Sequence, residues 1–367
     1  MEKRIGQGKI TVERRNDGCS VASDLFANYP CRLHLTSRPN NEIASLSTSV
    51  DNDNGNHNGN ENETSSITLS KALTCYVLGY GGGLISGDSI NLDVAVKPNA
   101  SLVVTSQSTS KAFKAIPGRD ASLVKTVATL GKGSLLFLVP QPMQCFGGSK
   151  LEQETHILLD GSASQDNTTG EKQNDPSLLL VDWYTGGREN LDGGLWNMES
   201  FHTVTTISYS KTNLFPEAEV ENGYETTASG AADCHERDLV FRDATRLSGG
   251  SDLIRHMRHF NIVCMVVIMG PRLKKVSQLF LDKFSSRHIY DETQIDGNDG
   301  ITTTATMKEN GNNRLNQNRG EGLNDTNEGL LVSCGTFHTL VSGSNHRESG
   351  VVLRLAADSL EIAGTIF

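Results

Sequence analysis

The chain has 367 residues, with 43 Asp and Glu against 33 Lys and Arg and a formal net charge of −10. This balance, without a clustered basic stripe, argues against a nucleic-acid-binding surface. No apolar run reaches the roughly 18 residues of a membrane span, and residues 1–15 lack the apolar segment of a signal peptide. The seven cysteines form no Cys-x-x-Cys pair, which predicts free thiols in a reducing, cytoplasmic compartment.

Four polar stretches interrupt the chain, and we expect them to be disordered surface insertions. They bury too little apolar surface to offset the entropy of ordering. Without them on the order of 270 residues remain, a size that folds as one all-β domain. The sequence therefore predicts a single domain over residues 1–367, with insertions at 41–66, 160–176, 217–238 and 291–328.

Short apolar runs separated by turn residues follow one another through the first two thirds of the chain. In the clearest run, Ile90–Val96, Leu92 and Val94 lie on one face while Asn91 and Asp93 lie on the other. This period of two is typical of a half-buried strand. The spacing of the runs predicts a mainly β fold; the others cover residues 73–78, 102–105, 135–139, 156–159, 178–183 and 203–209.

Helix is expected in the last third of the chain, where the pattern predicts two short pieces at residues 252–259 and Lys274–Phe284. In the second, Val276, Leu279, Phe280 and Phe284 recur at helical spacing. This apolar face needs a sheet or a partner to cover it, so the helix is a candidate docking element with Phe280 and Phe284 as contact residues. The β-branched run between the helices, at 262–269, predicts a buried strand.

Motifs that would identify an enzyme or a nucleotide-binding protein are missing. The glycines at 79–83 complete no dinucleotide fingerprint and precede no phosphate-binding Lys-Ser or Lys-Thr pair. Ser86 does not have the Gly-x-Ser-x-Gly spacing of a nucleophile elbow. A small β-fold hydrolase or isomerase would have to work with acid/base carboxylates such as Asp182 and Glu189, and this alternative stays open.

Several ordered motifs resemble those of a known family. LGYGGGLISGDSINL at 78–92, the Gln-Ser-Thr-Ser-Lys-Ala-Phe-Lys segment within 105–114, LFLVPQPMQCF at 136–146 and VDWYTGGR at 181–188 are similar to successive motifs of the urease accessory proteins called UreD, or UreH in some bacteria. The resemblance covers mostly residues 25–40, 70–215 and 239–285. It departs from the family where Gly186 replaces a signature serine and where residues 192–196 lack the glutamate of a Gly-Glu-x-Trp motif.

The resemblance implies an elongated, stacked-strand (β-helicoid) fold with about two helices, and a non-catalytic, cytoplasmic role in urease maturation. A protein of this family binds apo-urease and a UreF-like protein, which recruits a UreG-like GTPase. Nickel is then expected to be held transiently, with no tightly bound cofactor, on its way into the dinuclear nickel centre. A purely structural adaptor with no metal role is a further possibility.

Candidate site residues follow from this role. Carboxylates hold a divalent ion weakly enough to release it, and the candidates for a nickel conduit lie on or beside expected strands, at Asp88, Asp93, Asp182 and Glu199. Each has the alternative of a solvated surface position. Arg188 either pairs with a neighbouring carboxylate or contacts a partner, and Trp196 is either a core residue or a partner contact.

Overall fold

The computed structural model describes a large part of the chain, in several ranges. The expected insertion at 41–66 lies outside these ranges, as do most residues of the other three insertions. Within the last of them, residues 291–292 and 304–307 belong to an antiparallel pair, β16 (Ile289–Glu292) and β17 (Thr304–Met307). The described ranges are 5–36, 72–161, 174–188, 191, 193–216, 237–257, 260–285, 289–292, 304–307, 330–339 and 347–357.

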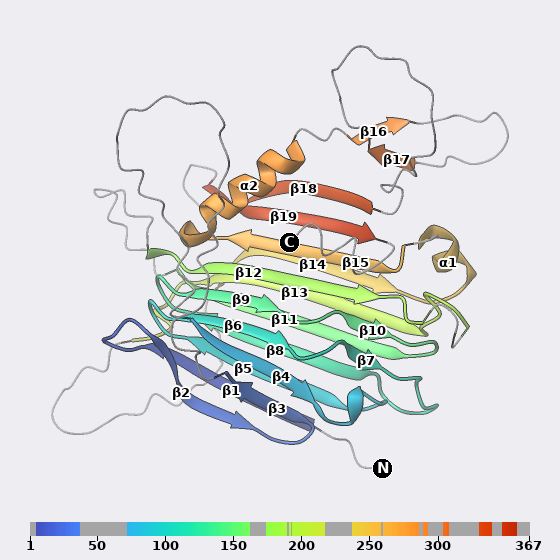
Figure 1. Cartoon of the computed structure of the whole chain (residues 1–367), viewed down its shortest axis with the longest axis horizontal. Helices are drawn as coiled ribbons and strands as arrows, with labels where there is room; N and C mark the ends of the chain where they lie inside the picture. Colours follow the sequence, from blue (N-terminus) through green and yellow to red (C-terminus); the bar gives the residue numbers. More distant parts are fainter. Residues whose placement is uncertain are drawn as a thin grey trace, which may run out of the picture.

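Two large sheets make up the body of the protein (Figure 1). Sheet A contains, in spatial order, β14 (Arg237–Leu247), β13 (Ser200–Ser210), β11 (Lys150–Asp160), β8 (Ser122–Leu130), β5 (Ser89–Val96), β1 (Ile5–Arg14) and β2 (Ser20–Ala27). Sheet B contains β18 (Leu330–Thr339), β19 (Arg347–Ala357), β15 (Ile262–Met269), β12 (Ser177–Thr185), β9 (Leu135–Val139), β6 (Ser101–Ser106), β4 (Leu73–Gly79) and β3 (Cys31–Leu35), with β7 (Ser110–Ala112) and β10 (Met143–Cys145) beside it.

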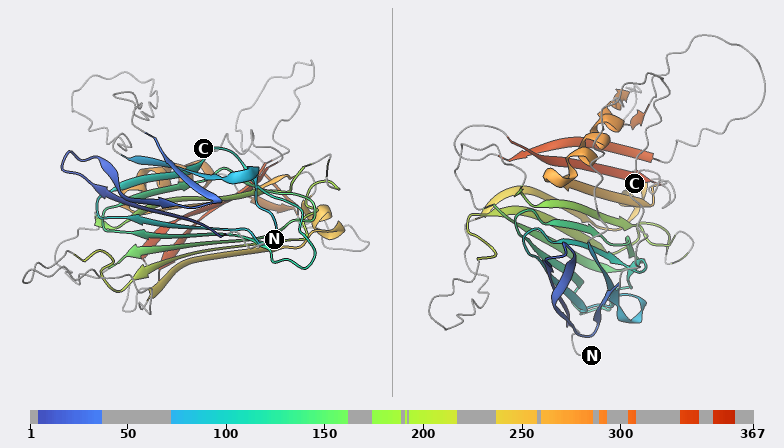
Figure 2. Two further views of the ribbon diagram at one scale, coloured as in Figure 1. Left: turned by 90° about the horizontal axis from the view of Figure 1, so that it is seen from below. Right: turned by 60° about the vertical axis from the view of Figure 1, so that its left-hand side comes forward.

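The chain passes back and forth between the sheets, because β5, β8, β11 and β13 belong to sheet A and the intervening β6, β9 and β12 belong to sheet B. Neighbours along this path are parallel within each sheet. Each strand of sheet A followed by one of sheet B thus makes one coil stacked on the last, and the two layers are visible in Figure 2. Antiparallel pairs add to both ends of the stack. The predicted mainly β, stacked-strand fold is confirmed.

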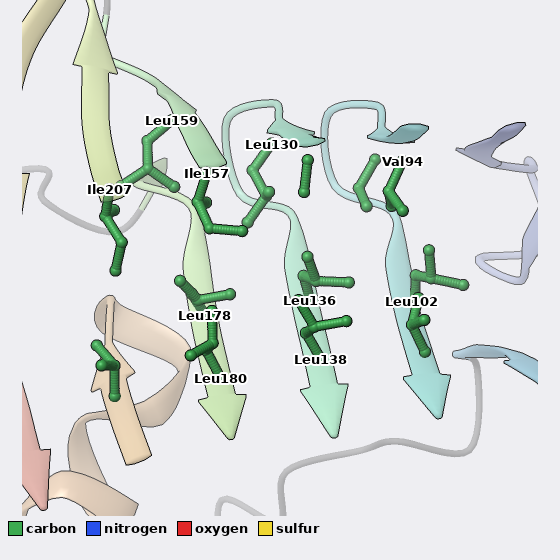
Figure 3. Packing of buried hydrophobic residues seen from close by; sticks show 14 of the residues in the cluster. Val94, Leu102, Leu130, Leu136, Leu138, Ile157, Leu159, Leu178, Leu180 and Ile207 are labelled. Carbon is green, nitrogen blue, oxygen red and sulfur yellow. The ribbon is translucent and has the colours of Figure 1, made fainter. Parts of the chain in front are cut away.

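The main core lies between the sheets, where alternate residues of each strand point inward (Figure 3). Leu136 and Leu138 on β9 and Leu178 and Leu180 on β12 face residues such as Ile157 on β11. Burying each such side chain contributes about 1.5–3 kcal/mol. The apolar run predicted at 135–139 coincides with β9, and the run predicted at 262–269 coincides with β15. The sequence did not predict β1, β8 and β14, because lysine, threonine or arginine interrupt the apolar pattern of these strands.

Two α-helices occur in the described part of the chain, α1 (Ser251–Met257) and α2 (Lys274–Ser285), as predicted. A short 3-10 turn at Pro271–Leu273 leads into α2, which lies across the outer face of sheet B (Figure 1). Val276 and Phe280 pack there against a second apolar cluster built on β15 and β19. The protein's own sheet therefore covers this face of the helix, and Phe280 serves packing. The side chain of Phe284 lies outside the described residues.

The cysteines and helices bear on two further expectations. The six cysteines in the described part form no disulfide bond, as the sequence predicted. Within the same part, no helix is both long enough and apolar enough to cross a membrane.

Candidate functional site

A band of polar side chains interrupts the apolar interior between the sheets. On β11, Gln153 and Thr155 occupy inward positions between Leu151 and Ile157, which belong to two different apolar clusters. On β13, the inward positions between Phe201 and Ile207 are likewise threonines. We call this set the interior polar belt; its members are Gln153, Thr155, Asp182, Thr203, Thr205 and Asp243.

Asp182 is the central residue of the belt. It lies on the inward face of β12 and is 7% exposed. Gln153 Nε2 donates to its Oδ1 at 2.7 Å, and Thr203 Oγ1 donates to its Oδ2 at 2.9 Å. Both donors come from sheet A, so the carboxylate of a sheet B strand is held from the opposite layer. Its two oxygens are thereby fixed in place between the sheets.

The pKa of the Asp182 carboxyl is raised to about 6, chiefly because burial disfavours the charged form. Hydrogen bonds from Thr203 and Gln153 oppose that rise, and the charge of Asp243 adds to it. At neutral pH the carboxylate is therefore mostly ionised, although it is buried. Neutral groups supply both of its short hydrogen bonds. Such a group attracts a cation more strongly than a solvated aspartate does.

Thr205 lies two residues beyond Thr203 on the same face of β13 and is 1% exposed. Its Oγ1 makes no hydrogen bond to any residue that the structure describes, although it approaches Asp182. A buried hydroxyl without a full partner costs about 1–3 kcal/mol. The belt therefore contains a buried hydroxyl beside Asp182 whose hydrogen-bonding capacity is not fully used within the described part of the chain.

The other predicted conduit carboxylates lie elsewhere. Asp88 is buried in a turn, where its Oδ2 accepts from the Ile85 N–H at 3.2 Å. Asp93 is exposed on the outer face of sheet A, level with Lys9 of β1. Glu199 is paired with Lys150 at 2.7 Å and its side chain is 56% exposed. Of these four predicted residues, only Asp182 belongs to the polar belt.

No group of three or more His, Cys, Asp or Glu that could hold a metal ion occurs within the described ranges. The donors of the belt are instead two carboxylates with hydroxyl and amide groups. Oxygen donors of this kind bind divalent transition-metal ions less tightly than thiolates do. Glu189, the second carboxylate of the enzyme alternative, lies outside the described residues.

Trp196 belongs to a third apolar cluster at the end of the strands, where it is fully buried. Its Nε1 donates to the Phe260 carbonyl at 2.7 Å. A side chain on Gly186 would lie 2.8 Å from the indole, so glycine replaces the signature serine to make room for the ring. The prediction of Trp196 as a partner contact is thereby corrected to the core alternative, because its entire surface is used inside the protein.

Arg188 lies at the same end of the body, partly exposed, with its Cζ 4.2 Å from the centre of the Phe146 ring. Phe146 in turn packs edge to face against Phe113, with 5.5 Å between the ring centres. Arg188 therefore stacks on Phe146 and does not pair with Asp182, whose oxygens are bonded to Gln153 and Thr203. The motifs at 105–114, 136–146 and 181–188 thus meet in space.

Sequence reasoning missed the partners of Asp182. Thr203 and Thr205 belong to a strand that also has Thr206 on its other face, so residue type alone does not tell which threonines point inward. Gln153 sits in the alternation Leu151, Gln153, Thr155, Ile157, which is a usable signal once the strand is known to cover a core.

Comparison with known proteins shows which family this chain resembles. The family model described as UreD urease accessory protein matches residues 5–364. Urease accessory protein D of Arabidopsis thaliana is 24% identical over 97% of this chain and 92% of its own length, and urease accessory protein UreD of Anaeromyxobacter sp. is 35% identical over 77% and 71%. An uncharacterized ureD-like urease accessory protein of Schizosaccharomyces pombe is 27% identical, and the match spans 58% of this chain and 63% of that relative's length.

Proposed function

The chain belongs to the UreD family of urease accessory proteins, and from this premise we propose that it is a non-catalytic scaffold through which nickel passes into urease. In this proposal it binds apo-urease and a UreF-like protein that recruits a UreG-like GTPase. The names of its relatives support the accessory role. The observation that carries the nickel role is the buried Asp182 carboxylate.

Asp182 has the chemistry of a transfer site. An ionised carboxylate suits a divalent cation, and oxygen ligands bind nickel less tightly than thiolates or several imidazoles do. The hydrogen bonds from Gln153 and Thr203 keep both oxygens oriented without neutralising their charge. A cation that meets one such carboxylate gains attraction in a poorly hydrated interior but remains exchangeable.

The scaffold role rests on the body around this residue. The ladders of the two sheets run without interruption from β2 to β14 and from β3 to β18, which makes a stiff frame. We place partner contacts at Arg188, which is partly exposed at the end where the family motifs meet, and on the solvent side of α2, where Leu279 is 54% exposed. Phe284 of the same helix stays a candidate contact.

The test is urease activation in cells that express the urease subunits and the other accessory proteins with Asp182→Asn or Asp182→Ala. We expect co-purification with the partners to persist while urease activity and the nickel content of urease fall several-fold. Asp93→Asn is the matched control, because it removes a carboxylate from the outer face of the neighbouring sheet. Normal activation by both Asp182 variants would refute the transfer role, and loss of partner binding would make Asp182 a structural residue.

A further inference from the structure

The interior polar belt reaches the surface at the edge of sheet A. Asp243 lies on β14, the edge strand, directly opposite Thr205 of β13. Residues opposite each other in an antiparallel pair point to the same face, so Asp243 shares the inward face of Thr205. Its side chain is 23% exposed. The belt therefore runs from the buried Asp182 to a carboxylate that solvent can reach.

Arg354 closes this end of the belt. Its Nη2 donates to Asp243 Oδ1 at 2.7 Å, and its side chain is 52% exposed. In sheet B, Asp182 of β12 lies opposite Met265 of β15, and Met265 lies opposite Arg354 of β19. Arg354 is therefore on the same inward face of the sheet as Asp182, two strands away. At about 4.8 Å per strand, the two backbones are separated by about 10 Å. The positive charge of Arg354 thus lies at the solvent-accessible end of the interior polar belt.

Behind Arg354, no positively charged side chain of the described residues is paired with Asp182. The negative charge of Asp243 acts on Asp182, where it adds to the effect of burial in disfavouring ionisation. Thr205 lies opposite Asp243 and close to Asp182. Its buried Oγ1 makes no hydrogen bond of good geometry in the described ranges. Two carboxylates and an unused hydroxyl oxygen at one place are the donors of a divalent cation site.

We propose that Asp243 and Thr205 form an outer binding site for a divalent transition-metal cation, and that Arg354 is its exchangeable counter-ion. The guanidinium holds Asp243 at rest and swings into solvent when the cation binds. Asp182 is then the inner site to which the cation moves. The inference rests on the proposed function, because the cation is the same cargo, but it concerns how the ion enters.

The ion pair itself has little value for stability, which makes the proposal testable. Exposed pairs contribute roughly 0–1 kcal/mol, and Arg354 is more than half exposed. Replacing it should therefore leave the fold intact. A purely structural role would leave cation affinity unchanged as well.

The experiment is equilibrium titration of the purified full chain with Ni²⁺, followed by calorimetry at constant ionic strength. Removing the competing charge with Arg354→Gln is expected to tighten Ni²⁺ binding about 5- to 10-fold, the equivalent of roughly 1 kcal/mol. Asp243→Asn is expected to weaken it by at least as much. Arg242→Gln is the matched control, since Arg242 is exposed on the other face of the same strand, and it should stay within about twofold of the unmodified chain.

Unchanged or weaker Ni²⁺ binding by Arg354→Gln would overturn the proposal, as would unchanged binding by Asp243→Asn. Circular dichroism checks that each variant is folded, and Arg354→Lys, which keeps a charge without the planar fork, should bind with intermediate affinity. If Arg354→Gln does not fold, an affinity of Arg354→Lys equal to that of the unmodified chain overturns the proposal. Failure here is distinct from failure of the transfer role, which urease activation by the Asp182 variants reports.

Discussion

Two parts of the protein interior differ in composition: one is apolar and stabilises the fold, and the other is polar and holds the candidate site. Around β5 and β9 the inward residues are Leu92, Val94, Leu136 and Leu138, and they form one continuous apolar layer between the sheets. On β12 and β13 the layer continues with Leu178, Leu180 and Ile207, but other inward positions of these two strands hold Asp182 and threonines. The stacked coils thus hold themselves together along one part of their length, so another part can carry polar groups that are bonded from sheet to sheet.

The largest effect is expected from the apolar layer. Leu136→Ala removes a fully buried side chain, and the cavity should lower the free energy of unfolding by about 2–5 kcal/mol. Denaturant unfolding followed by circular dichroism measures this change. The control Ile116→Ala alters a side chain that is 41% exposed and should cost about 0.5 kcal/mol or less. Equal losses for the two variants would show that the apolar layer is not the main source of stability.

A smaller effect, of opposite kind, is expected from the polar belt. The pKa of Asp182 is about 6 in the folded chain and about 3.9 in the unfolded chain, so ionisation of this carboxyl disfavours the fold. The resulting loss of stability, up to about 3 kcal/mol, develops as the pH rises from about 4 to 6. Below that window the carboxyl is protonated in both states and the cost is absent.

The measurement is the difference in the free energy of unfolding between the unmodified chain and Asp182→Asn across this pH window. The asparagine variant should gain stability relative to the unmodified chain as pH rises, because it cannot ionise. A difference that stays constant with pH would mean that Asp182 titrates normally and is not desolvated.

The smallest effect is expected one residue from the belt. Glu154 follows Gln153 on β11 but points outward, where it is paired with Lys125 at 3.2 Å and is 38% exposed. Glu154→Gln should change the free energy of unfolding by less than about 1 kcal/mol, and urease activation should stay normal. Gln153→Ala is the contrasting variant, since it leaves a buried carboxylate without one of its donors; comparable effects on activation from both variants would contradict the inward position of the belt.

Of the interior polar belt, the sequence named only Asp182, from its motif at the end of an apolar strand. Asp93 was named by the same reasoning and lies on the outer face of sheet A. Alternation separates the two faces of a strand, but it does not say whether the polar face meets solvent or a second sheet. Trp196 was undecided for the same reason, because burial depends on residues that are distant in the chain, such as Phe260.

By itself, the sequence determined the local elements and the family. The strands predicted at 90–96 and 262–269, the helix predicted at 274–284 and the ordered motifs all follow from short-range patterns of side chains. Only the tertiary structure decided that sheet B covers α2 and that Arg354 meets Asp243, 111 positions away in the chain. Such contacts arise because stacking the coils brings the inward faces of distant strands together. The alternation of apolar and polar residues within one strand does not show which strands will be neighbours.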